Sequence, residues 1–175
     1  MSIIIGQDTR VVVQGITGNE GSFHTRQMLL YGTTIVAGVT PGKAGQEVEG
    51  IPVYEHVSDA VGRHEANTSI IFVPARFARS AILEAIEASI KTIVVITESI
   101  PLKDSIELLA LARTAHSVII GPNTAGILSP NAKTHLGIMP THIFRPGSIG
   151  MVARSGTLTY EIAWHISHSG LGQST

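Results

Sequence analysis

A glycine-rich segment near the start of the chain has the composition of a loop that binds phosphate. It runs from Gly15 to Gly21, follows a β-branched run ending at Gln14, and leads into a helical pattern through Phe23 and Leu30. In this setting, free main-chain N–H groups and the helix dipole attract an anion. Thr17 stands where the dinucleotide fingerprint has its second glycine, so the segment favours another phosphate ligand. A tight turn without a ligand is the alternative interpretation.

The end of the second expected strand carries a lysine where a site for NAD would carry an acid. The segment from Gly38 to Lys43 has no Asp or Glu to accept the ribose hydroxyls, and Lys43 follows a glycine hinge. A lysine there suits a phosphate, either the 3′-phosphate of coenzyme A or the 2′-phosphate of NADP. A solvated loop charge is the structural alternative.

Two later strand ends supply backbone and hydroxyl groups at the same edge of the expected sheet. One is Val73-Pro74-Ala75 and the other Ile96-Thr97-Glu98. The Glu98 carboxylate could accept from adenine or pantetheine amide groups, or it could cap the helix that begins near Pro101. A further turn, Gly121 to Gly126, is interpreted as either structural or part of the site.

The positioning elements are short β-branched runs that alternate with helical patterns, which predicts parallel strands joined by helical crossovers in an α/β fold. Helices are expected at 77–90 and at 102–116, where Ile106, Leu109 and Ala110 are predicted to be buried. The expected strands are Arg10 to Gln14, Thr34 to Val39, Ser69 to Val73, Thr92 to Ile96 and Ser117 to Ile120.

The pattern pauses and then restarts, which predicts three segments. Residues 1–121 form the first domain, and 122–146, rich in Pro, Asn, Thr and Gly, form an irregular connection. Residues 147–175 contain a strand at 148–153 and a helix at 157–169. One strand and one helix cannot bury their own apolar faces, so this last segment is expected to be part of a truncated second α/β domain.

Composition excludes several classes of function. Charged residues make up 14% of the chain and the net charge is −1, so nucleic acid and membrane surfaces are not expected partners. No cysteine is present, which excludes disulfides and thiolate metal sites. The start of the chain lacks the pattern of an export signal and no apolar run has membrane-spanning length, so a cytoplasmic location is expected.

The histidines do not form an evident catalytic or metal site. His165 and His168 are three apart on one expected helix, but no third ligand is near them in sequence, and no metal is predicted. His142, close to the restart of the pattern, could approach a bound phosphoryl group, although a structural hydrogen bond is favoured. His135 receives no role. Surface or capping roles are expected for His24, His56, His64 and His116.

Taken in order, these segments resemble the α subunits of succinate-CoA ligases over essentially the whole chain. The sequence departs from the usual family sequence at positions 124, 125 and 141 and over the segment 131–135. These departures leave the identity of the acid open. The resemblance rests on Gln14-Gly15-Ile16-Thr17-Gly18, Gly38-Val39-Thr40-Pro41-Gly42-Lys43, Ile71-Phe72-Val73-Pro74-Ala75, Ile96-Thr97-Glu98, Gly121-Pro122-Asn123 and Arg154-Ser155-Gly156-Thr157-Leu158-Thr159-Tyr160-Glu161.

The resemblance implies a Rossmann-like domain that binds coenzyme A, followed by a truncated flavodoxin-like ligase domain. Tyr160 would contribute to the carboxylate substrate site, and the helix beginning at Ser155 and Gly156 would hold a phosphate at its N-terminus. The implied contacts of coenzyme A are Thr17, Gly18, Asn19, Glu20, Lys43, Val73, Pro74, Ile96, Thr97 and Glu98.

The resemblance also implies a reaction and a partner. A β subunit with an ATP-grasp domain would bind Mg-NTP, from which a histidine of the α subunit would be phosphorylated; the phosphoryl group would pass to succinate, and the CoA thiol would then attack the acyl phosphate. The family's Gly-His-Ala-Gly motif is absent from residues 1–175, so this segment alone is expected to be inactive. A malate-CoA ligase, a citrate-cleaving relative, a stand-alone CoA-binding regulatory module and an NADP-dependent oxidoreductase are the alternatives.

Overall fold

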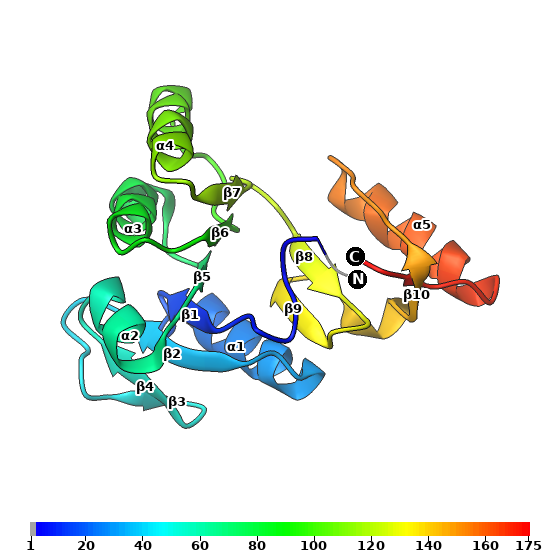
Figure 1. The fold of residues 1–175 in the computed structure, drawn as a ribbon, viewed down its shortest axis with the longest axis horizontal. Coiled ribbons are helices and arrows are strands. Elements are labelled where there is room, and N and C mark those ends of the chain that lie inside the picture. The colour runs from blue at the N-terminus through cyan, green and yellow to red at the C-terminus, as the bar shows by residue number, and fades with distance from the viewer. Residues whose placement is uncertain (1–2) are drawn as a thin grey trace.

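The computed structural model describes residues 3–175, so the first two residues of the expected first domain lie outside the described part. Its centre is a sheet with strand order β3-β4-β2-β1-β5-β6-β7 (Figure 1). Every neighbouring pair is parallel except β3 and β4. The order reverses between β1 and β5, as in the Rossmann fold, which confirms the predicted fold class. The strands are β1 (Val11–Gln14), β2 (Ile35–Val39), β3 (Glu47–Val48), β4 (Ile51–Tyr54), β5 (Thr68–Ile71), β6 (Thr92–Val95) and β7 (Val118–Ile120).

Apolar side chains cover both faces of this sheet, as β-branched central strands require. On one face, Val12 and Val95 pack with α2 (Val57–His64), α3 (Ala75–Glu87) and α4 (Leu102–Thr114). On the other, alternate strand residues such as Val11, Val13 and Val94 pack against Met28 of α1 (Asn19–Tyr31). The two cores fix the sheet, and with it the positions of the loops at its carboxyl edge.

A β-hairpin completes the second core where the sequence predicted irregular chain. It consists of β8 (Gly126–Ser129) and the antiparallel β9 (Thr134–Gly137), which is wholly buried. The Thr33 hydroxyl group donates to the main-chain oxygen of His135 and accepts from its main-chain nitrogen, at 2.8 and 2.9 Å. The segment 122–146 therefore contains regular structure. The sequence did not predict it, because a short hairpin has too few residues to display a clear alternating pattern.

The strand β4 was not predicted, and Pro52 explains why. A proline removes a backbone donor and normally argues against a strand. Here β4 pairs with β2 only through Val53 and Tyr54, and Pro52 lies opposite Glu47 of the short antiparallel β3. The chain therefore tolerates proline near the edge of the sheet.

The predicted buried face of α4 is wrong. Ile106 and Leu109 are 60% and 40% exposed and Ala110 is exposed, whereas Leu108 and Ala112 are buried. This helix is apolar around much of its circumference, so periodicity does not specify the face that packs inward. In α3, by contrast, the predicted residues Ile82, Ala85 and Ile86 are all buried.

The C-terminal part of the chain lies beside the hairpin (Figure 1). It contains a 3₁₀ turn (Thr141–Ile143), β10 (Pro146–Ile149) and α5 (Gly156–His168), and the returning chain at Gln173 bridges in parallel to β10. The strand thus lies slightly before the predicted 148–153. On α5, Leu158 and Ile162 are 51% and 40% exposed, while Ala163 and Ser167 are buried. No helix within residues 3–175 is long and apolar enough to cross a membrane.

Candidate functional site

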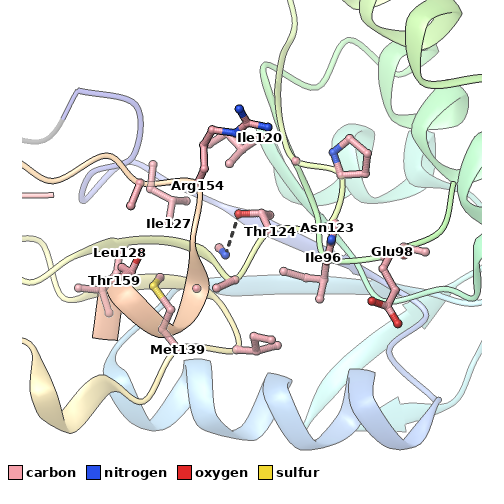
Figure 2. Close-up of a pocket in the computed structure, with 18 of the residues that line it drawn as sticks. Ile96, Glu98, Ile120, Asn123, Thr124, Ile127, Leu128, Met139, Arg154 and Thr159 are labelled. Carbon is pink, nitrogen blue, oxygen red and sulfur yellow. Dashed lines mark hydrogen bonds between the residues drawn. The ribbon is translucent and has the colours of Figure 1, made fainter. Parts of the chain in front are cut away.

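A cleft with a volume of about 1470 Å³ extends from the carboxyl edge of the sheet to the beginning of α5 (Figure 2). This volume exceeds the usual range for a small-ligand pocket, roughly 300–1,000 Å³, and suits an elongated ligand. The cleft brings together nine of the predicted site residues: Glu20, Val73, Pro74, Ile96, Thr97, Glu98, Ser155, Gly156 and Tyr160. Thr17, Gly18, Asn19 and Lys43 do not line it: the first three directly precede Glu20 in the chain, and Lys43 lies in the turn after β2.

The loop after β1 presents main-chain donors at the switch point. Gly18 is the N-cap of α1, and as a glycine it has no side chain to accept a hydrogen bond from the first turn. The first α-helical bond runs from the Ser22 nitrogen to the Gly18 oxygen at 2.8 Å. The amides of Asn19, Glu20 and Gly21 therefore precede the hydrogen-bonded turns of the helix. Such amides, with the helix dipole, suit the oxygens of a phosphate.

Gly21 allows α1 to approach this loop closely. A Cβ atom at position 21 would overlap the carbonyl group of Gly15, which is backbone and cannot rotate away. A side chain here would force the helix away from the end of β1. The close approach is what directs the N-terminal amides of α1 toward the switch point.

We expect Gly21→Ala to destabilise the chain by at least about 1 kcal/mol, because it overpacks backbone against backbone. Urea unfolding measures the loss. The matched control is Gly62→Ala, in α2, where a Cβ meets nothing within 4 Å and where alanine stabilises a helix. Equal stabilities for the Gly21→Ala variant and the wild type would contradict the close contact.

The turn after β2 lies beside the loop after β1. The Thr17 nitrogen is 3.5 Å from the Thr40 hydroxyl oxygen, and the Lys43 nitrogen donates to the Thr40 oxygen at 3.0 Å. Lys43 is exposed, and its ammonium group has no ion-pair partner within the described part of the chain. The cation is therefore available to an incoming anion.

Hydrogen bonds join the ends of three strands along the cleft. The Thr97 hydroxyl group donates to the Val73 oxygen at 2.7 Å, and the Asn123 nitrogen donates to the Thr97 oxygen at 3.0 Å. Figure 2 shows Ile96, Asn123 and Glu98 along this edge. Glu98 lines the cleft and does not cap α4, whose N-cap is Pro101 without a side-chain bond, so the capping alternative is wrong.

The far end of the cleft is formed by the start of α5. The Ser155 hydroxyl group caps this helix by accepting from the Leu158 nitrogen at 3.4 Å, and Gly156 is exposed. Tyr160, one turn further, is half-buried, and burial raises its pKa, so it stays a neutral hydrogen-bonding group near neutral pH. The two ends of the cleft thus each offer a helix N-terminus.

The sequence interpretation overlooked several residues that line the cleft. His24 stacks against Phe72, with ring centroids 5.5 Å apart, and its Nε2 lies 3.4 Å from the Glu20 carboxylate. Burial is the main influence on its pKa and lowers it, against the opposing effect of Glu20. The i, i+4 spacing of Glu20 and His24 could have indicated this pair. Thr124 and Arg154 also line the cleft, between its two ends (Figure 2).

The other histidines lie away from the cleft. His142 is exposed in the 3₁₀ turn and does not line it. His168 stacks on Trp164 and pairs with its main-chain oxygen at 2.8 Å. Within residues 3–175, no group of three or more His, Asp or Glu side chains is arranged to hold a metal ion.

Main-chain amides at the N-terminus of α1, an exposed lysine in the neighbouring turn and a long cleft are features of an α/β protein that suit an extended phosphorylated ligand. The CoA binding domain family matches residues 6–99, just over half of the sequence. The chain belongs to this family.

Relatives extend the similarity to the whole chain and confirm the predicted resemblance. The chain is 58% identical over all 175 residues to succinate–CoA ligase [ADP-forming] subunit alpha 2 of Archaeoglobus fulgidus, covering 61% of that protein. It is 54% identical over 177 aligned positions to the alpha subunit from Aquifex aeolicus, covering 58% of it. The chain thus spans about three fifths of the length of these relatives.

Among solved structures, ATP citrate lyase from Methanothrix soehngenii, in complex with citrate and coenzyme A, has a similar fold. The TM-score is 0.84 at 25% identity, over 98% of this chain and 31% of that one. A dinucleotide-forming acetyl-coenzyme A synthetase from Ca. Korarchaeum cryptofilum gives 0.81 at 24% identity, over 95% and 37%, a likeness of fold alone.

Proposed function

We propose that this chain is the coenzyme A-binding part of the α subunit of a succinate-CoA ligase. The observation that carries the proposal is the continuous cleft, which begins beside Glu20 at the carboxyl edge of the sheet and ends at the N-terminus of α5. In the proposed complex the amides at Asn19 to Gly21 and the Lys43 ammonium group, on the neighbouring turn, would bind the phosphates of coenzyme A.

The middle of the cleft suits the pantetheine arm. Its wall combines apolar side chains with a few polar groups, the usual lining of a site for an extended organic ligand. The apolar members include Ile96, Ile120, Ile127, Leu128, Met139 and Phe144. A thiol carried along this wall would reach the region of Asn123, Thr124 and Ser155, and the Ser155–Gly156 end of α5 would stabilise a phosphate or acyl phosphate there.

The partner and the second domain belong to the same proposal. A β subunit with an ATP-grasp domain would bind Mg-NTP, and β10, α5 and the strand at Gln173 would begin the ligase domain that follows a first domain of residues 1–121. The exposed apolar side chains of α5 support this division, because one helix and one strand leave them uncovered. Tyr160 would contact the carboxylate substrate, and the reaction would take place in the cytoplasm.

A binding measurement tests the ligand. By calorimetry, coenzyme A should bind more tightly than NADPH by at least about tenfold, which corresponds to roughly 1.4 kcal/mol. Both molecules offer a ribose phosphate to Lys43, but the largely apolar middle of the cleft suits a pantetheine arm. Tighter binding of NADPH would overturn the proposal.

The identity of the acid needs a separate assay. The α subunit together with its partner should ligate succinate in preference to malate, and it should not cleave citrate. The relatives named above support succinate, whereas the departures at positions 124 and 125 lie in the part of the cleft that the acyl group would approach. Preference for malate or citrate would leave the proposed CoA site intact and would change the proposed acid substrate.

A further inference from the structure

The turn that carries Lys43 is bound to the end of β4 by a carboxylate that no sequence motif identified. The Gly42 nitrogen donates to both oxygens of Glu55, at 3.0 Å to Oε1 and 2.8 Å to Oε2. Glu55 follows β4 directly and is half-buried, at the same edge of the sheet as the switch point. Hydrogen bonds to an ionised acceptor are stronger than neutral ones.

This turn lies on the surface, and its residues 41–46 are all exposed. Gly42 and Gly45 have φ angles of 74° and 85°, and a Cβ at either position would meet nothing within 4 Å. Backbone bonds also connect the turn to β4: Thr40 donates to Tyr54 at 3.2 Å, Gly45 donates to Val53 at 3.0 Å, and Val53 donates to Gln46 at 2.9 Å. Between them, Glu55 supplies the side-chain contact at the residue adjacent to Lys43.

We propose that Glu55 is a positioning residue that holds the turn so that Lys43 can recognise the ribose phosphate of the ligand. The carboxylate is bound to the Gly42 amide and is not paired with the lysine, so it orders the backbone and leaves the cation free. The inference rests on the proposed function. It adds Glu55 to the residues through which the site would select a phosphorylated ribose over an unphosphorylated one.

Two substitutions distinguish a positioning role of Glu55 from an effect of its negative charge. Glu55→Ala removes the acceptor, whereas Glu55→Gln keeps an amide oxygen that can accept from Gly42 and removes the charge. If Glu55 positions the turn, Glu55→Ala should weaken coenzyme A binding about five- to tenfold, since an ordered cation is lost, and Glu55→Gln should stay within about twofold of the wild type. Dephospho-coenzyme A, which lacks the 3′-phosphate, should bind equally to all of them.

The matched control is Glu47→Ala. Glu47 is an exposed acid of β3 that pairs with β4 through its backbone, so the variant removes a negative charge from the same edge without touching the Gly42 amide. Its affinity for coenzyme A should equal that of the wild type. Thermal unfolding of each variant shows whether the fold is retained before binding is compared.

The outcomes distinguish this inference from the proposed function. Wild-type protein that fails to bind coenzyme A would reject the function itself. Wild-type binding with an unchanged affinity in Glu55→Ala would overturn the positioning role alone. Tighter binding in both Glu55 variants would also overturn it, because the carboxylate would then act only by repelling the phosphate.

Discussion

Lowering the pH from 7 to 4 should reduce the free energy of unfolding by roughly 2–3 kcal/mol through His135 alone. The imidazole is 1% exposed, and neither ring nitrogen has a hydrogen-bond partner in the part of the chain that the structure describes. Burial lowers its pKa from 6.5 to about 4, with a smaller contribution from His24. The Tyr31 ring packs on it at 5.9 Å and offers no compensating charge.

The direction of the effect follows from the two states. The unfolded chain binds a proton near pH 6.5 and the folded chain only near pH 4, so protonation favours unfolding between these values. The stabilisation by the neutral imidazole is fully present above pH 6.5 and declines as the pH falls. Below pH 4 no further stability is lost through this group. Urea unfolding at pH 7, 5.5 and 4 measures the decline.

Comparison with a variant isolates the histidine from the other titrating groups. His135→Met cannot take up a proton and should lose less stability on acidification than the wild type, by the same roughly 2–3 kcal/mol. His116→Asn is the control, since His116 is exposed at a φ of 56°, which asparagine tolerates. The explanation fails if the wild type and His135→Met decline in parallel.

The parts of the fold predicted from sequence were those encoded by short-range patterns. Five β-branched runs located β1, β2, β5, β6 and β7 to within a few residues, because buried parallel strands need apolar side chains on both faces. The hairpin and β4 have no such signal. Their stability comes from contacts far apart in sequence, such as that between Thr33 and His135.

The same distinction holds for the site. Residues at strand ends were predicted because the carboxyl edge of a parallel sheet gathers them, and five of them, Val73, Pro74, Ile96, Thr97 and Glu98, do line one cleft. Glu55 escaped notice because its strand was missed and because its partner is a main-chain amide 13 positions earlier. His135 received no role, since its burial depends on how the hairpin packs on α1.

Lys43→Glu should weaken the binding of coenzyme A by about 10- to 100-fold, because it removes a charge-assisted contact and places a negative charge beside the 3′-phosphate. Lys43 has no competing ion pair within residues 3–175, so the loss does not include a broken internal contact. Dephospho-coenzyme A should be affected much less. Calorimetry with both ligands gives the ratio.

Lys91→Glu provides the matched control. Lys91 is also exposed, but it precedes β6 and therefore lies at the amino edge of the sheet, opposite the switch point. The Lys91→Glu substitution changes the net charge by the same amount as Lys43→Glu, so a general electrostatic effect would appear in both variants. Equal losses for Lys43→Glu and Lys91→Glu, or equal losses for coenzyme A and its dephospho form, would reject Lys43 as the phosphate contact. A loss confined to Lys43→Glu and to the phosphorylated ligand would place that phosphate at the turn after β2.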